Sequence, residues 1–270
     1  MLVVLRHLSR RARRPTPAAL EEAVPFSRAA LYTVAGGTVF GLAASGAWVL
    51  AQEKTTPDDK DVVCSCAERV RVFSAVSGQY DATVGRDEVV MGLPILRWWL
   101  LRRASGDVLE VAAGTGSNLK WYDMKKCNRI TATDASRPML EVAARKIKHK
   151  PWAHKVVLRE VEVSSLGVEQ FDTVVDTFGL CSFEDPVAAL ATLQRSCKPD
   201  GTLLLLEHGR SYYTPINNLL DKYAARHLRA WGCTWNRDII KILQEAGLQV
   251  DSLTRFHFGT TYLIVARPRP

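Results

Sequence analysis

From about residue 70 onward, short runs rich in β-branched residues alternate with longer stretches of helical periodicity. This alternation is typical of βαβ units, in which parallel strands form one sheet and the intervening helices cover its faces. Seven strands are predicted, at Val108–Ala112, Arg129–Thr133, Lys155–Val161, Phe171–Asp176, Thr202–Glu207, Leu248–Thr254 and Thr261–Ala266. Helices are expected at Ser117–Lys126, Arg137–His149, Pro186–Cys197, Pro215–Trp231 and Arg237–Ala246. We therefore predict one α/β domain over residues 70–270, with a mostly parallel seven-stranded sheet and helices on both faces.

The first predicted strand runs into a turn that contains Gly114 and Gly116. Glycines let the backbone turn tightly and approach a ligand closely, and the free N–H groups of a following helix attract a negative group. The third glycine of the dinucleotide-binding pattern is replaced by Leu119, which argues against a nicotinamide dehydrogenase. A glycine turn without any ligand is the alternative. The turn alone therefore predicts a binding site without naming the ligand.

The second predicted strand ends at Asp134. A carboxylate at this place can accept hydrogen bonds from both ribose hydroxyls of a nucleoside. The alternative is that it caps the next helix, which is expected to have Ser136 at its N-cap and Pro138 in its first turn. Ala135 and Met139 would then flank an adenine ring.

Several of these motifs resemble those of one enzyme family. Glu110 and the two glycines that follow it resemble the cofactor loop of class I S-adenosylmethionine-dependent methyltransferases. Residues 193–208, L-Q-R-S-C-K-P-D-G-T-L-L-L-L-E-H, resemble the fifth strand and preceding turn of the ubiquinone and menaquinone biosynthesis (UbiE-like) group, with Asp200 in place of a glycine. Upstream, residues 72–81 resemble the family's Y-D element, which here contains Tyr80. The ordered combination extends over about residues 70–266.

The resemblance implies a Rossmann-like fold and S-adenosylmethionine as the cofactor. It places Tyr80 over the cofactor and Glu162, where the family has Asp, near the adenine amino group. The cofactor contacts that it implies come from Tyr80, Glu110, Ala112, Gly114, Thr115, Gly116, Asp134, Ala135, Met139, Glu162, Val163 and Thr177.

Two later segments resemble the membrane-anchored branch of this family, which includes mitochondrial inner-membrane proteins of fungi and anchored methyltransferase-like proteins of animals. They are the pair Glu207-His208 and the segment G-C-T-W-N-R-D over residues 232–238. This resemblance implies a presequence, a membrane anchor and a small-molecule or lipid-like acceptor.

The N-terminal residues predict targeting and anchoring. Residues 1–28 hold six arginines against Glu21 and Glu22, which accounts for half of the formal charge of +8. This composition is typical of a mitochondrial presequence, and the cytoplasmic flank of a signal anchor is the alternative. No charged residue lies between Ala29 and Ala51, a segment long enough to cross a hydrocarbon core of about 30 Å. We predict a single transmembrane helix at residues 29–51 in the mitochondrial inner membrane and a linker over residues 52–69, with a cleaved signal sequence as the alternative.

The basic flank favours an N-terminus in the matrix or cytosol, so the catalytic domain would face the intermembrane space. Because import routes can override this rule, the side of the membrane is left open.

The charge and the cysteine spacing limit which classes of partner and metal site are expected. The chain beyond residue 28 is only mildly basic, which argues against a nucleic-acid partner. Of the six cysteines only Cys64 and Cys66 are close in sequence, so the spacing predicts no metal site. These two cysteines are interpreted as linker thiols without function, and a redox-active pair in an oxidising compartment is the alternative.

Three residues at predicted strand ends are candidates for catalysis: Asp176, Glu207 and His208. Open α/β sheets bind ligands beyond the carboxyl ends of their strands. His208 is the preferred acid or base because the ordinary pKa of histidine is close to neutral, and the alternative is a structural hydrogen bond to the following helix. Four aromatic residues either form a lid over the acceptor or pack the last helices on the sheet: Tyr212, Tyr213, Trp231 and Trp235.

The predicted function is methyl transfer from S-adenosylmethionine to a small molecule at a membrane, the acceptor being a quinone precursor, lipid, phenol or thiol. Methyl transfer is an in-line displacement, so positioning of donor and acceptor supplies much of the catalysis. The alternative is a catalytically weak or inactive assembly factor that binds a protein complex or ribosomal RNA in mitochondria.

Overall fold

The computed structural model describes residues 65–269. The predicted leader and membrane span lie outside these residues. Among residues 65–269, no helix combines the length and the apolar composition that crossing a bilayer requires.

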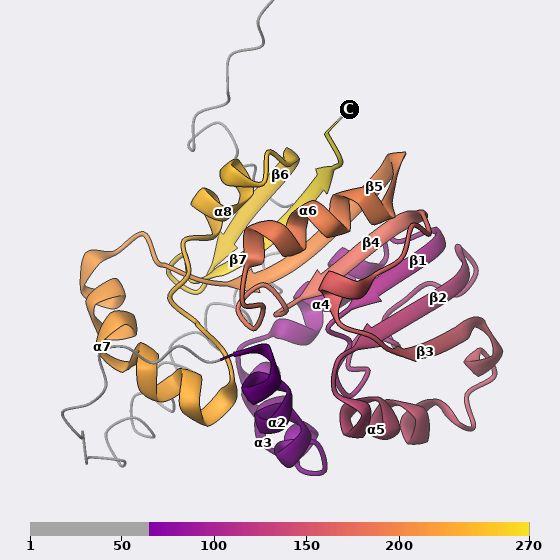
Figure 1. Ribbon diagram of the computed structural model, residues 1–270, viewed down its shortest axis with the longest axis horizontal. Helices are drawn as coiled ribbons and strands as arrows, with labels where there is room; N and C mark the ends of the chain where they lie inside the picture. Colours follow the sequence, from indigo (N-terminus) through magenta and orange to yellow (C-terminus); the bar gives the residue numbers. More distant parts are fainter. Residues whose placement is uncertain (1–64, 270) are drawn as a thin grey trace, which may run out of the picture.

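Seven strands form one sheet in the order β3-β2-β1-β4-β5-β7-β6 (Figure 1). The pairs from β3 to β5 are parallel, whereas β7 runs antiparallel to both β5 and β6. The strands are β1 (Gly106–Val111), β2 (Cys127–Asp134), β3 (Val156–Glu160), β4 (Phe171–Thr177), β5 (Cys197–His208), β6 (Gln249–Phe256) and β7 (Thr261–Arg267). Each overlaps a predicted strand, and the mostly parallel seven-stranded sheet is confirmed.

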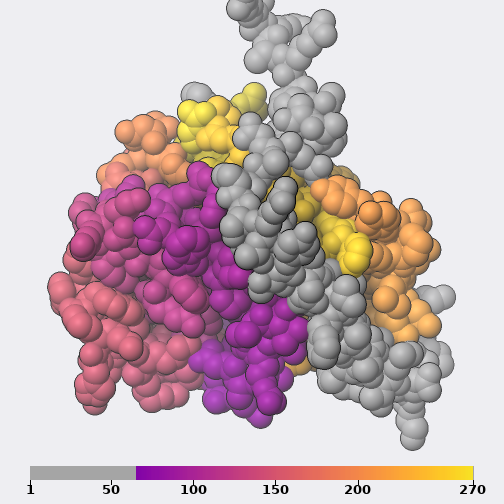
Figure 2. All heavy atoms as spheres, turned by 180° about the vertical axis from the view of Figure 1, so that it is seen from behind, coloured from indigo at the N-terminus to yellow at the C-terminus, as the bar shows by residue number. Residues whose placement is uncertain are grey.

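The helices are α2 (Cys66–Val76), α3 (Tyr80–Val90), α4 (Leu93–Leu101), α5 (Arg137–Ile147), α6 (Pro186–Ser196), α7 (Thr214–Trp231) and α8 (Ile239–Glu245). Two short 3₁₀ helices lie at Ala153–Lys155 and Val163–Ser165. In Figure 1, α6 and α8 lie in front of the sheet and α4 lies behind it. Figure 2 shows the reverse side, where purple atoms lie at the centre, magenta and salmon atoms lie to the left, and yellow and orange atoms lie at the top and right.

Each face of the sheet has its own apolar core. On one face, Leu96 and Leu100 of α4 pack with Val175 and Leu204 of the central strands. On the other face, residues of α6 and α8 such as Leu190 pack with alternate residues of the same strands. Because successive side chains of a strand point to opposite faces, the apolar strands β4 and β5 contribute to both cores.

The N-terminal helices were not predicted. α2 begins at Cys66, inside the range expected to be linker, and its start is stabilised by a capping box in which Ser65 and Glu68 bond each other's backbone N–H groups. Residues 66–69 are therefore helical.

The predicted helix at Ser117–Lys126 is wrong. The chain there forms successive turns, with Leu119 N–H donating to Gly116 O and Trp121 N–H donating to Asn118 O. The buried Asn118 side chain is held by hydrogen bonds to neighbouring strands, and this anchoring fixes the backbone in turns.

Candidate functional site

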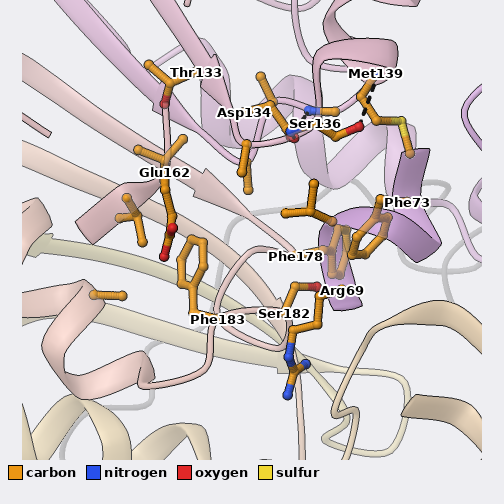
Figure 3. Close-up of a pocket in the computed structure, with 18 of the residues that line it drawn as sticks. Arg69, Phe73, Thr133, Asp134, Ser136, Met139, Glu162, Phe178, Ser182 and Phe183 are labelled. Carbon is orange, nitrogen blue, oxygen red and sulfur yellow. Dashed lines mark hydrogen bonds between the residues drawn. The ribbon is translucent and has the colours of Figure 1, made fainter. Parts of the chain in front are cut away.

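A cavity of about 420 Å³ lies beyond the carboxyl ends of β1, β2 and β4. Small-molecule sites usually measure about 300–1,000 Å³, so a cofactor-sized ligand fits. Figure 3 shows Asp134, Ser136 and Met139 at one side of this cavity and Glu162 and Phe183 across it, and Phe73 and Phe178 also line it. The cavity is thus where an open parallel sheet is expected to bind its ligand.

Most of the predicted cofactor residues meet at this cavity. Those that line it are Tyr80, Ala112, Gly114, Thr115, Asp134, Ala135, Met139, Glu162, Val163 and Thr177. Glu110 and Gly116 do not line it. Cys66, which was interpreted as a linker thiol, does line it, and burial raises the pKa of its thiol to about 11.

The two glycines of the turn have different roles. Gly114 has a φ of 54°, and a Cβ added there would meet no atom of the described residues within 4 Å. Gly116 has a φ of 73°, and a Cβ added there would lie 2.8 Å from the Leu119 side chain and 3.1 Å from the Ala143 side chain. Gly114 therefore leaves open space for a ligand, whereas Gly116 allows the turn to pack on α5.

Two non-glycine residues at the cavity also adopt the left-handed region, Ala112 with a φ of 48° and Phe178 with a φ of 59°. This conformation costs about 1–3 kcal/mol and persists only where the surroundings enforce it. Both residues follow directly after a strand, β1 and β4 respectively. Backbone strain is therefore concentrated where the strands reach the cavity.

Asp134 connects the glycine turn to the start of α5. One carboxylate oxygen accepts a 2.8 Å hydrogen bond from Gly114 N–H, and the other accepts one of 2.8 Å from Ser136 N–H. Burial raises the pKa of Asp134, although these two N–H groups act in the opposite direction. Because a carboxylate has about four acceptor sites, lone pairs remain for a ligand. Ser136 caps α5 as predicted, accepting from Met139 N–H.

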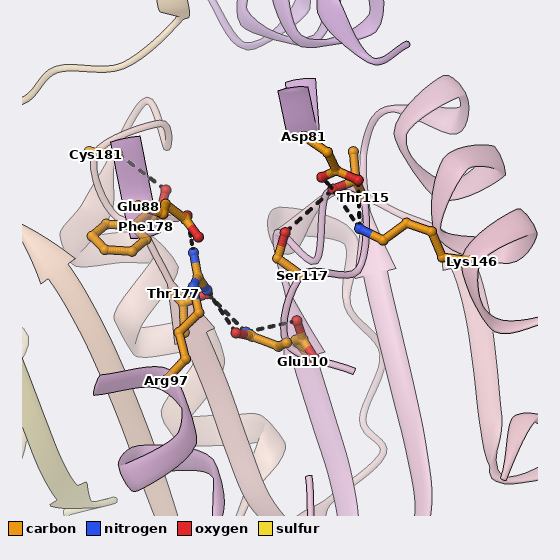
Figure 4. A network of polar contacts seen from close by, with 11 residues as sticks. Asp81, Glu88, Arg97, Glu110, Thr115, Ser117, Lys146, Thr177, Phe178 and Cys181 are labelled. Carbon is orange, nitrogen blue, oxygen red and sulfur yellow. Dashed lines mark hydrogen bonds and ion pairs between the residues drawn. The ribbon is translucent and has the colours of Figure 1, made fainter. Parts of the chain in front are cut away.

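A buried polar network forms part of the cavity wall, and Figure 4 shows its contacts. The Arg97 guanidinium of α4 forms an ion pair with Glu88 of α3 at 2.6 Å. It also donates to Asn118 Oδ1 at 2.7 Å and to Thr177 Oγ1 at 2.8 Å. The network therefore joins two helices, the glycine turn and the end of β4. No sequence pattern predicted this network because its members are far apart along the chain.

The same network explains the position of Glu110. Its carboxylate accepts from Asn118 Nδ2 at 3.0 Å and from the Tyr122 hydroxyl at 2.8 Å. Glu110 is fully buried, and burial raises its pKa to about 7. In this structure its carboxylate holds the turn, and the contact with the cofactor that the family resemblance implied stays a prediction.

Glu110→Gln is expected to change the pH dependence of stability. A folded pKa of about 7 lies above the ordinary value of 4.5, so the folded protein binds this proton more tightly than the unfolded chain and loses stability as pH rises between these values. The shift corresponds to about 3 kcal/mol. Because Gln does not titrate, the stability of the variant relative to the parent should rise by up to this amount between about pH 4.5 and pH 8.

Urea denaturation of the full-length chain at several pH values measures this difference. Glu141→Gln, at an exposed position of α5, is the control and should follow the parent curve. If the free energies of unfolding of Glu110→Gln and its parent changed in parallel with pH, Glu110 would not titrate in this range.

A second polar cluster holds the glycine turn from the outer side (Figure 4). Asp81 of α3 accepts from Thr115 Oγ1 at 2.6 Å and pairs with Lys146 of α5 at 2.8 Å. Asp81 follows Tyr80 in the Y-D element, and the sequence alone predicted no role for this aspartate. The element therefore contributes one residue to the cavity wall and one to the turn.

The three catalytic candidates do not line the cavity. Asp176 and Glu207 are fully buried, and burial raises the pKa of both carboxyl groups well above their usual range. Neither carboxyl group accepts a hydrogen bond of normal geometry among the described residues. The nearby backbone N–H groups of Leu180 and Gly179 offset only part of the rise in the Glu207 pKa. Side chains alternate along β4, so Thr177 faces the cavity and Asp176 faces away from it. His208 is half-buried, and its ring lies 5.4 Å from that of Phe178, which does line the cavity.

The predicted aromatic lid is not found at this cavity. Trp235 stacks on His227 with ring centroids 3.9 Å apart and donates to Leu220 O, and Tyr212 packs on the Arg255 guanidinium. Neither they nor Tyr213 and Trp231 line the cavity, whose aromatic residues are Phe73, Tyr80, Phe178 and Phe183. Tyr212 and Trp235 therefore pack against other residues of the domain, which was the alternative to a lid.

Comparisons with known proteins place this chain in a family. The chain is 41% identical over 212 residues to the mitochondrial methyltransferase OMS1 of Saccharomyces cerevisiae, which covers 72% of this chain and 45% of that protein. It thus spans about half the length of this relative. The ubiquinone/menaquinone biosynthesis C-methyltransferase UbiE of Shewanella frigidimarina is 28% identical over 178 residues, covering 62% of this chain and 69% of the relative. The predicted resemblance to this group is confirmed.

Solved structures share the fold at low sequence identity. The DhpI–SAH complex superposes with a TM-score of 0.59 at 19% identity, covering 78% of this chain and 100% of that one. The [4+2]-cyclase SpnF superposes with a TM-score of 0.62 at 14% identity, covering 78% and 98%. Since the second of these is named for a different reaction, these likenesses establish the fold alone. The profile of the methyltransferase domain family, however, matches residues 86–253, which is more than half of the sequence, and the chain belongs to this family.

Proposed function

We propose that this protein is an S-adenosylmethionine-dependent methyltransferase that acts on a small-molecule acceptor at a mitochondrial membrane. The observation that carries the proposal is the cavity itself, which brings the glycine turn, Asp134 and an aromatic wall together at the carboxyl ends of the strands. Family membership and the homology to methyltransferases support the reaction type.

The residues present fit the cofactor that the family implies. Gly114 leaves a cradle free of side-chain atoms, and Asp134 offers acceptors for ribose hydroxyls. Met139 and Glu162 line the same cavity and would border the adenine. When bound, the cofactor supplies an electrophilic methyl group on a sulfonium.

The remaining wall suits an apolar or aromatic acceptor. Phe73, Phe178 and Phe183 line the cavity, and aromatic side chains give large contact areas to flat or hydrocarbon ligands. Glu88 also lines it, but its carboxylate is paired with Arg97. The chain's contribution is therefore to position the acceptor and exclude water, which suits an acceptor that arrives already deprotonated or with a free lone pair. A quinone precursor, phenol or thiol meets this condition as its anion, and a lipid meets it through an unprotonated nucleophile.

The location at a mitochondrial membrane rests on the sequence. Residues 1–28 have the composition of a presequence, residues 29–51 form an uncharged segment, and the OMS1 relative is mitochondrial by name. Alkaline carbonate extraction of mitochondria that contain the full-length protein is expected to leave it in the membrane pellet. Release into the supernatant would contradict a stable membrane span.

Calorimetric titration of the full-length chain with S-adenosylmethionine and S-adenosylhomocysteine tests the proposed activity. Micromolar binding, about −8 kcal/mol, is expected for both. Transfer of a labelled methyl group to a panel of phenols, thiols and quinone precursors then identifies the acceptor. A folded chain that binds neither compound would instead support the assembly-factor alternative.

A further inference from the structure

Three metal-ligating side chains meet behind the cavity wall. Cys181 follows β4, His208 ends β5 and Cys233 follows α7. One ligand atom from each lies within 4.8 Å of the other two, and His208 Nε2 is 2.8 Å from Cys233 Sγ. Both cysteines are buried and His208 is half-buried. The fold thus brings together residues that are 25 or more positions apart, which is why their spacing gave no signal.

The backbone around the two cysteines is fixed by further hydrogen bonds. Thr234 N–H donates to Cys181 O at 2.8 Å, which ties one cysteine segment directly to the other. The buried Arg69 guanidinium donates to Gly232 O at 2.8 Å and to Cys181 O at 3.4 Å. Such supporting contacts orient metal ligands and strongly affect affinity. The two thiols are therefore held in place by the protein and do not meet by chance on mobile loops.

We propose that Cys181, His208 and Cys233 bind a Zn²⁺ ion. Two sulfurs and one imidazole nitrogen are a ligand set that suits zinc, and the charges of two thiolates balance the ion so that a neutral complex is buried. Binding would release one proton from each thiol to solvent. Three protein ligands leave the fourth tetrahedral position to water or another small ligand.

The geometry requires only a small rearrangement. Tetrahedral Zn–S and Zn–N bonds place ligand atoms about 3.6–3.8 Å apart. The distance between His208 Nε2 and Cys233 Sγ, now 2.8 Å, would therefore grow by roughly 1 Å. A pair of ligand atoms at the 4.8 Å limit of the cluster would have to approach by a similar amount. Changes of this size are within the reach of side-chain rotation.

The site is separate from the proposed cofactor residues but lies close to them. The His208 ring packs near Phe178, and Ser182, which adjoins Cys181, lines the cavity together with Phe178. The inference depends on the positions of the three ligands and does not depend on the proposed methyl transfer.

Metal titration of the full-length, reduced and chelator-treated chain tests the site, with Zn²⁺ and the spectroscopic probe Co²⁺. One Zn²⁺ per chain is expected, and Co²⁺ should show thiolate charge-transfer absorption with tetrahedral d–d bands. Cys181→Ser, Cys233→Ser and His208→Ala should each weaken Zn²⁺ binding by at least ~100-fold, since even outer-shell partners contribute about 10–100-fold. Cys197→Ser, which removes a buried thiol at the opposite end of β5, is the matched control and should bind as the parent does.

X-ray absorption at the zinc edge of the unmodified protein gives a readout that needs no variant. Two sulfur neighbours at about 2.3 Å and a nitrogen at about 2.0–2.1 Å are expected. The proposal is overturned if the reduced chain binds no Zn²⁺, if the cysteine variants bind it as well as the parent, or if the zinc has only oxygen and nitrogen neighbours. A disulfide between Cys181 and Cys233 that persists in the reduced, zinc-supplied protein would also overturn it.

Discussion

Replacing Arg97 with Met is expected to lower the free energy of unfolding by about 3–5 kcal/mol. The Arg97 side chain is 6% exposed and its partner Glu88 is 15% exposed, so the ion pair lies almost entirely out of water. Met occupies a similar volume but leaves the Glu88 carboxylate buried without a cation. It also removes the donor to Asn118 and Thr177. Urea denaturation of the full-length chain measures the loss.

Two further variants separate this effect from the mere loss of a charge. Arg137→Met breaks an exposed ion pair with Glu141, whose side chains are 73% and 57% exposed, and should change stability by no more than ~0.5 kcal/mol. The double variant Glu88→Gln with Arg97→Met removes both buried charges and should recover part of the loss. If Arg97→Met behaved like Arg137→Met, the buried network would not be a major contributor to stability.

The Arg97 network also connects the stability of the domain to the shape of the site. Arg97, Glu88 and Thr177 all line the cavity, and Asn118 belongs to the glycine turn. The contacts that stabilise the packing of α3 and α4 on the sheet therefore also fix one wall of the site. A substitution that is aimed at stability here should change ligand affinity as well.

The strands and much of the cavity wall could be predicted because both depend on local patterns. A parallel strand is buried on both faces and is recognisable as a short apolar run, such as residues 203–206. The carboxyl ends of parallel strands meet at one edge of the sheet. Residues at or just beyond the carboxyl ends of β1, β2 and β4, including Gly114, Asp134 and Phe178, therefore converge whatever the intervening sequence is.

The remaining features depend on contacts between distant residues, for which no local pattern exists. Arg97 contacts Thr177 across 80 positions and Asn118 across 21. These contacts hold the chain after Gly116 in turns, where a helix was predicted, and they include Glu110 in the buried network. The same limit hid the cluster of Cys181, His208 and Cys233, since metal-site patterns in a sequence require short spacing. The catalytic candidates were predicted from strand position alone, because the sequence does not show which face of the sheet each side chain occupies.

Asp134→Ala is expected to weaken binding of S-adenosylmethionine by about 1–3 kcal/mol, on the order of 5–150-fold in Kd. In the proposed complex the carboxylate accepts the ribose hydroxyls, and Ala provides no acceptor there. The substitution also frees the N–H groups of Gly114 and Ser136, each held at 2.8 Å, so the turn loses its attachment to α5. Calorimetric titration of the full-length variant measures both the affinity and the fraction of chains that bind.

Asp172→Ala separates ligand binding from the loss of an anchoring carboxylate. Asp172 also accepts a 2.8 Å hydrogen bond from a backbone N–H, that of Asp107, and it pairs with Lys198, but it lies near the amino end of β4, opposite to the cavity. Its loss should leave the affinity for S-adenosylmethionine unchanged. If Asp134→Ala bound with parental affinity while folded, the ribose would be held by other residues. If both variants lost binding equally, the effect of Asp134 would lie in the stability of the sheet ends and would say nothing specific about the cofactor.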